Sequence, residues 1–237
     1  MIKPLFVSCC LLLASAVQAD TTLNFIAPGS VPVPTKLTDR HVRMQMSATQ
    51  WALYDAEQDT VSIVDDGKKE YSVVDQATVA KLAAVLAEQR TQLQAMLKTM
   101  PASQRKQMEQ MMGQVLSADS YSPELKDGKG KKTIAGLDCK PREVFVNGEH
   151  KQSVCVVDSS KLGISTAELA TMTGFFDMFS RMPIGPKQPS LEQFGGVPIE
   201  IYSPGGGPQQ TLVSVSHDSI PADQFTVPAK YFRRSLH

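Results

Sequence analysis

The chain has 237 residues, 42% of them hydrophobic, and its 24 Lys and Arg residues balance 24 Asp and Glu residues. No basic block is longer than two residues, so nucleic acid is excluded as an expected partner. The length exceeds the usual single-domain value, yet β-rich domains reach it as one unit, and we expect a single domain over residues 20–237.

The first nineteen residues resemble a secretory signal peptide. Lys3 precedes an apolar run at 5–16 that is too short to cross a bilayer, and Val17-Gln18-Ala19 is a small-residue cleavage pattern. We expect cleavage before Asp20 and export to the periplasm, with secretion from the cell as the alternative. No later run approaches the roughly 18 apolar residues of a membrane-spanning helix, so no transmembrane anchor is expected.

Four β-strands are predicted after a proline-rich stretch at 28–34. Val42, Met44 and Met46 alternate with polar residues, which predicts a half-buried strand over 41–47. Apolar runs at 51–54, 61–64 and 71–74 follow, separated by turns rich in Asp. This spacing predicts an antiparallel meander.

A helical pattern replaces the strands after Asp75, a residue suited to a helix N-cap. Its apolar stripe consists of Val79, Leu82, Leu86, Leu93, Met96 and Met100. Pro101 interrupts the pattern, and a second helix is predicted to about residue 116. The apolar side of that helix carries Met108, Met111, Met112 and Val115. The two segments predict a helical hairpin over about 76–116, followed by a polar linker at 117–130.

Ser165 and Glu168 form a capping box that opens a third helix. The predicted apolar stripe of this helix is Leu169, Met172, Phe176 and Phe179. Two strands at 198–202 and 211–217 then flank a glycine-rich turn. The order of elements predicts an α+β fold in which a curved antiparallel sheet is covered by the helical hairpin and the third helix.

Cys139 and Cys155 flank the Asn147-Gly148 turn, and an exported chain is expected to pair them in a disulfide. A two-residue loop would place the cysteines on opposite faces of the hairpin, so we predict a three-residue loop at 146–148. The facing pairs would then be Cys139 with Cys155, Glu143 with Lys151, and Leu137 with Val157. Without a CxxC spacing, and with both thiols expected to be buried, a structural disulfide is favoured over a redox or metal pair.

The sequence has no familiar pattern of catalytic or metal-binding residues. The four histidines lack the spacing that brings two imidazoles to one metal, and neither a GxSxG motif nor a complete phosphate loop occurs. We therefore expect a protein that is not an enzyme and holds no cofactor or metal. A carboxylate within hydrogen-bond reach of His217 at the bottom of a cleft would favour an enzyme instead.

The methionines of the predicted helices have three interpretations: thioether ligands for Cu(I), ordinary core, or the adaptable lining of a cavity for apolar ligands. The copper interpretation lacks neighbouring His or Cys, whereas the core interpretation remains open. The cavity interpretation gives these candidate ligand-binding residues: Met44, Met46, Trp51, Leu93, Met96, Met100, Met108, Met111, Met112, Met172, Phe176 and Phe179.

Several short motifs together resemble a family of uncharacterised bacterial exported proteins, a domain of unknown function. The motifs lie at 42–46, 54–55, 60–64, 69–75, 100–105, 136–139 with Cys155, and 225–231. The order of strands, helices and strands also resembles, more distantly, the periplasmic lipoprotein carriers and receptors of the LolA and LolB type. That resemblance implies a half-barrel sheet around an apolar cavity stoppered by helices, and it supplies no catalytic residues.

Two functions follow as hypotheses. The first is a non-enzymatic periplasmic carrier whose ligand is a lipid or a lipoprotein acyl chain. The alternative is an envelope protein-interaction or chaperone module that docks a partner protein on its amphipathic helices. The segment 101–107 is similar to envelope stress chaperones of the Spy type at the level of one helix.

Overall fold

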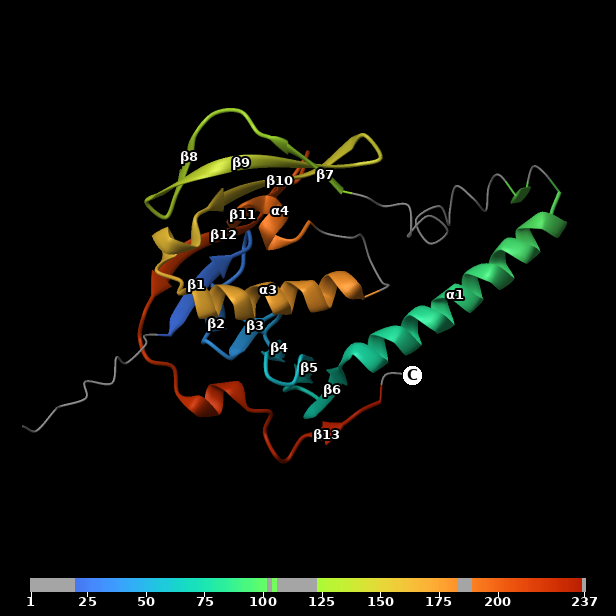
Figure 1. The fold of residues 1–237 in the computed structure, drawn as a ribbon, viewed down its shortest axis with the longest axis horizontal. Coiled ribbons are helices and arrows are strands. Elements are labelled where there is room, and N and C mark those ends of the chain that lie inside the picture. Colours follow the sequence, from blue (N-terminus) through green and yellow to red (C-terminus); the bar gives the residue numbers. More distant parts are fainter. Residues whose placement is uncertain (1–19, 102–103, 106–122, 183–188, 236–237) are drawn as a thin grey trace, which may run out of the picture.

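A large β-sheet forms the body of the protein (Figure 1). The computed structural model describes residues 20–101, 104–105, 123–182 and 189–235. Its first six strands are β1 (Thr21–Ile26), β2 (Val33–Leu37), β3 (His41–Gln45), β4 (Gln50–Asp55), β5 (Thr60–Asp65) and β6 (Glu70–Val74). The others are β7 (Pro123–Asp127), β8 (Lys132–Ile134), β9 (Leu137–Val146), β10 (Glu149–Val157), β11 (Val197–Ser203), β12 (Gly207–Ser216) and β13 (Phe232–Arg233).

The strands form one open sheet in the order β13-β6-β5-β4-β3-β2-β1-β12-β11-β10-β9-β7, with β8 paired to β9. Strands β13 and β6 run parallel, and the other pairs are antiparallel, including the pair that joins the two halves, β1 with β12. The predicted meander over β3 to β6 is therefore confirmed, as is the α+β class with a mainly antiparallel sheet.

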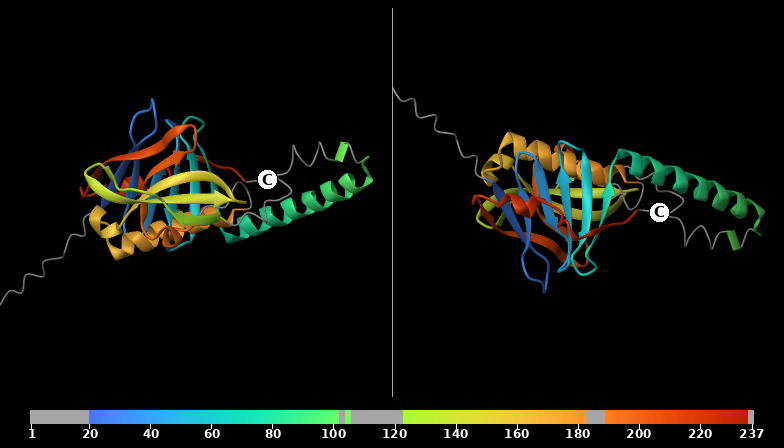
Figure 2. Two further views of the ribbon diagram at one scale, coloured as in Figure 1. Left: turned by 90° about the horizontal axis from the view of Figure 1, so that it is seen from above. Right: turned by 90° about the horizontal axis from the view of Figure 1, so that it is seen from below.

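The helix α3 (Thr166–Arg181) lies across one face of the sheet, as Figures 1 and 2 show. Its Met172, Phe175 and Met178 pack in a single core cluster with residues from both halves of the sheet, such as Val42 of β3 and Ile199 of β11. Strands are spaced by about 4.8 Å, so twelve of them side by side would extend over roughly 50 Å if flat, far more than one helix can cover. The sheet is therefore bent around α3.

The predicted capping box of this helix is present. Ser165 Oγ accepts from the backbone N–H of Glu168, and Glu168 Oε2 accepts from the backbone N–H of Ser165 at 2.8 Å. The predicted stripe is only partly correct, because the buried arc is centred near Phe175. Phe176 is the next residue, about 100° around the helix, and its side chain is 40% exposed.

The helix α1 (Gln76–Thr99) begins at Asp75, whose side chain accepts from the backbone N–H of Thr78 at 2.7 Å. Val79 packs against the main core, and the rest of the helix projects away from the sheet (Figures 1 and 2). The prediction that this segment covers the sheet was wrong. Ala, Gln and Thr residues interrupt the apolar stripe of α1. The apolar face of the helix is therefore narrow, and packing against the sheet would bury little apolar surface. The second helix of the predicted hairpin lies outside the described residues.

The far face of the sheet is covered by the C-terminal segment. Phe225, in the short 3-10 helix η3 (Ala222–Phe225), packs with Trp51 and Leu53 of β4 and Val64 of β5. Arg43 Nη1 donates to the backbone carbonyl of Gln224 at 2.8 Å. Both faces of the β3 to β6 region are therefore buried, one by α3 and one by the chain end.

The hairpin of β9 and β10 departs from the predicted register. Asn147 and Gly148 have φ of 53° and 78° and form a two-residue turn, so Val146 faces Glu149. A bulge at Lys151 then adds one residue to β10, and Cys155 faces Pro141 instead of Cys139. The bulge restores the parity that the shorter turn removes, so both cysteines still point to one face.

The Cys139–Cys155 disulfide is present, with a Cα–Cα distance of 5.5 Å, and both residues are buried in the main core. It joins the strands diagonally. The other predicted facing pairs were wrong because the turn is shorter and β10 contains a bulge. Glu143 faces Ser153, and Leu137 faces Ile134 of β8. Lys151 forms an ion pair with Glu149 on its own strand. The predicted pairing of the cysteines is confirmed even though the predicted loop is not.

Three segments that were not predicted as strands are also part of the sheet. β1 and β2 come from the N-terminal and proline-rich stretches, and Pro34 of β2 faces Asn24 of β1. The predicted polar linker contains β7, where Leu125 alone packs against a small cluster under β9 and β10. These segments form strands because they pair with neighbouring strands of the sheet. Such pairing between distant residues is not visible in a local sequence pattern.

Candidate functional site

The predicted ligand-binding residues do not form one site. Leu93, Met96 and Met100 lie near the far end of the projecting part of α1, where Met96 is 45% exposed. Met108, Met111 and Met112 lie outside the described residues. The α1 part of the predicted cavity lining is therefore not brought to the sheet.

Three of the predicted residues do meet. Met44 of β3 and Phe179 of α3 are partly buried against the main core, in which Met172 is fully buried. The Phe175 ring contacts the Phe179 ring edge-on, with centroids 4.9 Å apart. For these residues, the ordinary core interpretation of the methionine-rich pattern describes the contacts.

Trp51 was wrongly assigned to the same cavity as α3. It is 2% exposed on the opposite face of the sheet, because side chains alternate along β4 and Ala52 and Tyr54 take the α3 face. The Arg43 guanidinium lies 4.0 Å from the centre of its ring, and Trp51 Nε1 donates to Asp66 Oδ1 at 3.0 Å. Met46 lies in the turn after β3 and is 40% exposed.

An open pocket of about 490 Å³ lies at the end of the α3 face of the sheet. It is bordered by the turn between β8 and β9, the 3-10 helix η2 (Ser159–Leu162) and the end of β12. The lining residues are Ala135, Leu137, Ser160, Lys161, Leu162, Gly163, Ser214, Val215 and His217. Leu162 belongs to the main core, and Leu137 and Val215 pack against it, so the apolar floor of the pocket continues the core.

His217 is held in the pocket by its neighbours on two sides. Its Nδ1 lies 3.4 Å from the hydroxyl of Thr21, which is fully buried. On the other side, a Cβ atom on Gly163 would lie 2.6 Å from both Cε1 and Nε2 of the ring. Gly163 has a φ of 67° and ends η2, so glycine suits both the backbone and the close imidazole. Among the described residues, His217 has a hydroxyl as its partner and no carboxylate.

The pocket lining contains one lysine and no acidic residue. One acid close to the lining is Asp158, the N-cap of η2, whose Oδ1 accepts from the backbone N–H of Ser160 at 2.9 Å and from its hydroxyl at 2.7 Å. These hydrogen bonds from Ser160, followed by the nearby Lys161 charge, lower the pKa of Asp158. The pocket lining therefore carries one exposed positive charge, at Lys161, with the Asp158 carboxylate near it.

The disulfide supports one wall of this pocket. Cys139 follows Leu137 by two residues on β9, and Lys132, which faces Cys139, forms an ion pair with Glu200 of β11. Glu200 faces Cys155. The bond and the ion pair together hold the β8–β9 turn against β10 and β11, which fixes the position of Ala135 and Leu137 at the rim.

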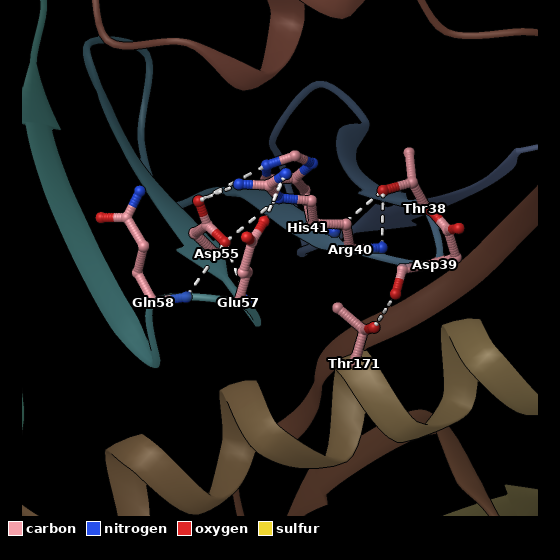
Figure 3. A network of polar contacts seen from close by, with 8 residues as sticks. All are labelled: Thr38, Asp39, Arg40, His41, Asp55, Glu57, Gln58 and Thr171. Atoms are coloured by element: carbon pink, nitrogen blue, oxygen red, sulfur yellow. Dashed lines mark hydrogen bonds and ion pairs between the residues drawn. The ribbon is translucent and has the colours of Figure 1, made fainter.

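Figure 3 shows a second polar cluster, around the turn between β2 and β3. Arg40 donates from Nη2 to Asp55 Oδ2 at 3.2 Å, and Thr171 of α3 donates its hydroxyl to the Asp39 carbonyl at 2.6 Å. His41 Nε2 lies 3.9 Å from Asp55, and its ring stacks on Phe225 with centroids 5.3 Å apart. These contacts fasten the turn to α3 and to the chain end, so a structural role accounts for them.

The ionisable groups of this cluster have shifted pKa values. Burial lowers the pKa of His41, and the nearby Asp55 charge opposes that change without cancelling it. Burial by itself would raise the pKa of Asp55, but hydrogen bonds from Arg40 and from the backbone N–H groups of Glu57 and Gln58 outweigh it and lower the pKa.

Two further classes of site are not found in the part of the chain that the structure describes. No group of three or more His, Cys, Asp and Glu residues there is arranged to hold a metal ion. Nor does any helix in the described ranges have the length and apolar content needed to cross a bilayer.

The sequence interpretation missed most of the pocket. It noted His217 and the thiols, but it treated Leu137 only as a partner of Val157 and did not consider Lys161 or Leu162. The one local sign was the run Asp158 to Gly163, an N-cap followed by a C-terminal glycine, which marks a short helical turn. Only the tertiary structure brings this turn next to the end of β12.

Comparison with known proteins gives distant likenesses only. No family model and no curated protein matches the chain. An uncharacterized conserved protein from Thermus thermophilus is 5% identical, with a TM-score of 0.45 over 93% of this chain and 92% of that one. MucB is 12% identical, with a TM-score of 0.32 over 91% of this chain and 59% of that one.

Proposed function

We propose that this protein is a non-enzymatic periplasmic binding or carrier protein for a ligand with an apolar chain. The observation that carries the proposal is the open pocket of about 490 Å³ whose floor is made by Leu137, Leu162 and Val215. Small-ligand sites have volumes of about 300–1,000 Å³ and combine apolar side chains with polar groups. This pocket lies in that range, and its lining is about equally polar and apolar. The ligand site of this proposal is the pocket, not the methionine-rich helices.

The bent sheet is consistent with this role. We infer that the sheet and α3 form a half-barrel of the LolA and LolB type, with α3 filling its middle and the pocket opening at one end. The lateral opening leaves room for a chain to extend from the pocket toward solvent. A lipid or a lipoprotein acyl chain fits that description.

Export to the periplasm is part of the proposal. The buried disulfide supports it, because such bonds form and persist in oxidising compartments. Fractionation of cells that produce the full-length chain tests it. Protein from the periplasmic fraction should begin at Asp20, and intact chain confined to the cytoplasm would contradict this part.

The ligand proposal is tested with N-phenyl-1-naphthylamine, a fluorescent apolar probe. We expect saturable binding of the probe and its displacement by 1-decanol. The variant Leu137→Asn with Val215→Thr keeps side-chain size nearly constant and should weaken binding about tenfold through lost apolar contact. Val213→Thr is the matched control, because Val213 is exposed on the same strand outside the pocket.

Native mass spectrometry of protein from the periplasm gives an independent readout, in which a lipid should co-purify with the unmodified chain. Absence of co-purifying lipid together with no probe binding would end the carrier proposal. Equal binding by the pocket variant and the Val213 control would place the ligand elsewhere.

A second function, an envelope protein-interaction or chaperone module, is favoured by α1. This helix projects from the sheet and exposes Val85 and Met96. We expect a photo-crosslinking residue at either position to capture a partner protein, and Val85→Glu should abolish capture from position 96. Capture of lipid instead of protein would favour the carrier, and a cross-link that ignores Val85→Glu would contradict docking on this face.

A further inference from the structure

The polar residues of the pocket differ in whether they are already engaged. The Ser160 hydroxyl donates to Asp158, and the Ser214 hydroxyl accepts from Asn24 Nδ2 at 3.1 Å. Both serines thus have partners within the protein. A ligand entering the pocket gains little by competing for these groups.

Lys161 and His217 are different. No carboxylate among the described residues forms an ion pair with Lys161, and the ammonium of a lysine is positively charged at neutral pH. His217 uses Nδ1 toward Thr21, while within the described ranges Nε2 has no hydrogen-bond partner and lies beside Gly163. As far as the described residues extend, Lys161 forms no ion pair within 4.0 Å, although its charge interacts with that of Asp158, and one ring nitrogen of His217 has no hydrogen-bond partner next to the apolar residues of the pocket.

Charge and shape point to one class of ligand. An apolar chain fits against Leu137, Leu162 and Val215, and an anionic head group would neutralise Lys161 at the rim. A neutral head group would gain no charge–charge contact with Lys161, and an added cation would be repelled by it. Charge-assisted hydrogen bonds to an anion are roughly twice as strong as neutral ones.

We propose that the pocket selects single-chain amphiphiles with an anionic head, a carboxylate or a phosphate, through Lys161 and Nε2 of His217. This inference rests on the proposed binding function and adds the specificity of its polar end. Lys161 supplies charge, and His217 supplies a directional hydrogen bond fixed by Thr21 and Gly163.

Calorimetric titration of the full chain with three ligands of equal chain length tests the proposal: decanoate, decyl phosphate and 1-decanol, each below its aggregation limit. We expect at least one anion to bind about tenfold more tightly than 1-decanol, since one charge-assisted contact contributes on the order of 1.4 kcal/mol. The comparison of the two anions distinguishes a fatty-acid source from a phosphate ester.

Variants assign the preference to residues. Lys161→Gln should weaken binding of the anions about tenfold relative to 1-decanol and so remove the preference, and His217→Gln should reduce the preference in part. Lys81→Gln, on the exposed surface of α1, is the matched control and should retain the preference. Melting temperatures check that each variant is folded.

The failures are distinguishable. If 1-decanol binds as tightly as both anions, or if Lys161→Gln keeps the preference, anion selection is overturned and the binding function stands. If none of the three ligands binds, the binding function fails and the anion selection fails with it.

Discussion

The Tyr54 hydroxyl lies 2.5 Å from the place that a Cβ atom on Gly174 would occupy. Gly174 is in the middle of α3, and Tyr54 is buried on β4 with its hydroxyl donating to Asp59 Oδ1 at 3.1 Å. Burial, followed by this hydrogen bond, raises the pKa of Tyr54 to about 12. The helix approaches the sheet closely at this point because residue 174 has no side chain.

Gly174→Ala should therefore destabilise the protein. Alanine favours a helix by about 1 kcal/mol over glycine, but overpacking a fixed ring costs about 1–3 kcal/mol. We expect a net loss measured by denaturant unfolding. In a Tyr54→Phe background the contact at 2.5 Å is gone and only the ring contacts at 3.1 and 3.2 Å remain, so the same substitution should cost less. An equal cost in both backgrounds would show that the hydroxyl is not the obstacle.

Removal of the disulfide should lower stability. The Cys139–Cys155 bond spans 16 positions of sequence, and closing such a loop stabilises by roughly 3 kcal/mol on the chain-entropy model. The double variant Cys139→Ala with Cys155→Ala should unfold at lower denaturant concentration and lose affinity for ligands in the adjacent pocket. A reducing agent should affect the wild type and not the variant. Unchanged unfolding of the reduced wild type would contradict a stabilising role.

Two hairpin turns with the same backbone differ in sequence. The β9–β10 turn uses Asn147-Gly148, and the β8–β9 turn uses Ala135-Gly136, with φ of 49° and 79°. Asn tolerates this left-handed conformation better than Ala, so Ala135→Asn should stabilise by about 0.5–1 kcal/mol and Asn147→Ala should destabilise by a similar amount. Thermal unfolding of both variants checks the opposite signs. Changes of equal sign would contradict this account.

Stability should fall as the pH falls from about 7.5 to about 5, on either side of the ordinary histidine pKa. The pKa of His41 is lowered by burial from its usual 6.5, so the unfolded chain takes up a proton at this residue at higher pH than the folded chain does. Stability from the neutral ring is present above 6.5 and is lost as the pH approaches the folded value. His41→Gln should flatten the dependence, whereas replacement of the exposed His150 serves as control. A His41→Gln profile parallel to the wild type would exclude this group.

The sequence alone determined the local features of this protein, since each depends on residues close together in the chain. Alternation predicted β3, apolar runs between turns predicted β4 to β6, Asp75 capped α1, and Ser165 with Glu168 opened α3. The positions of the two cysteines on either side of one turn predicted the disulfide, because a hairpin brings such residues together. The predicted turn was one residue too long, and the bulge at Lys151 cancelled the effect of that error on the face that the cysteines share.

Tertiary structure decided what each surface is for. Whether α1 covers the sheet depends on how its first turn meets Asp59 and the core. What buries Trp51 depends on the segment around Phe225, which returns from far along the chain. The pocket joins η2 to residues of β9 and β12, and it exists only because a bent sheet brings those distant segments to one end of α3. A periodic pattern records that a side chain is apolar, and packing determines what it contacts.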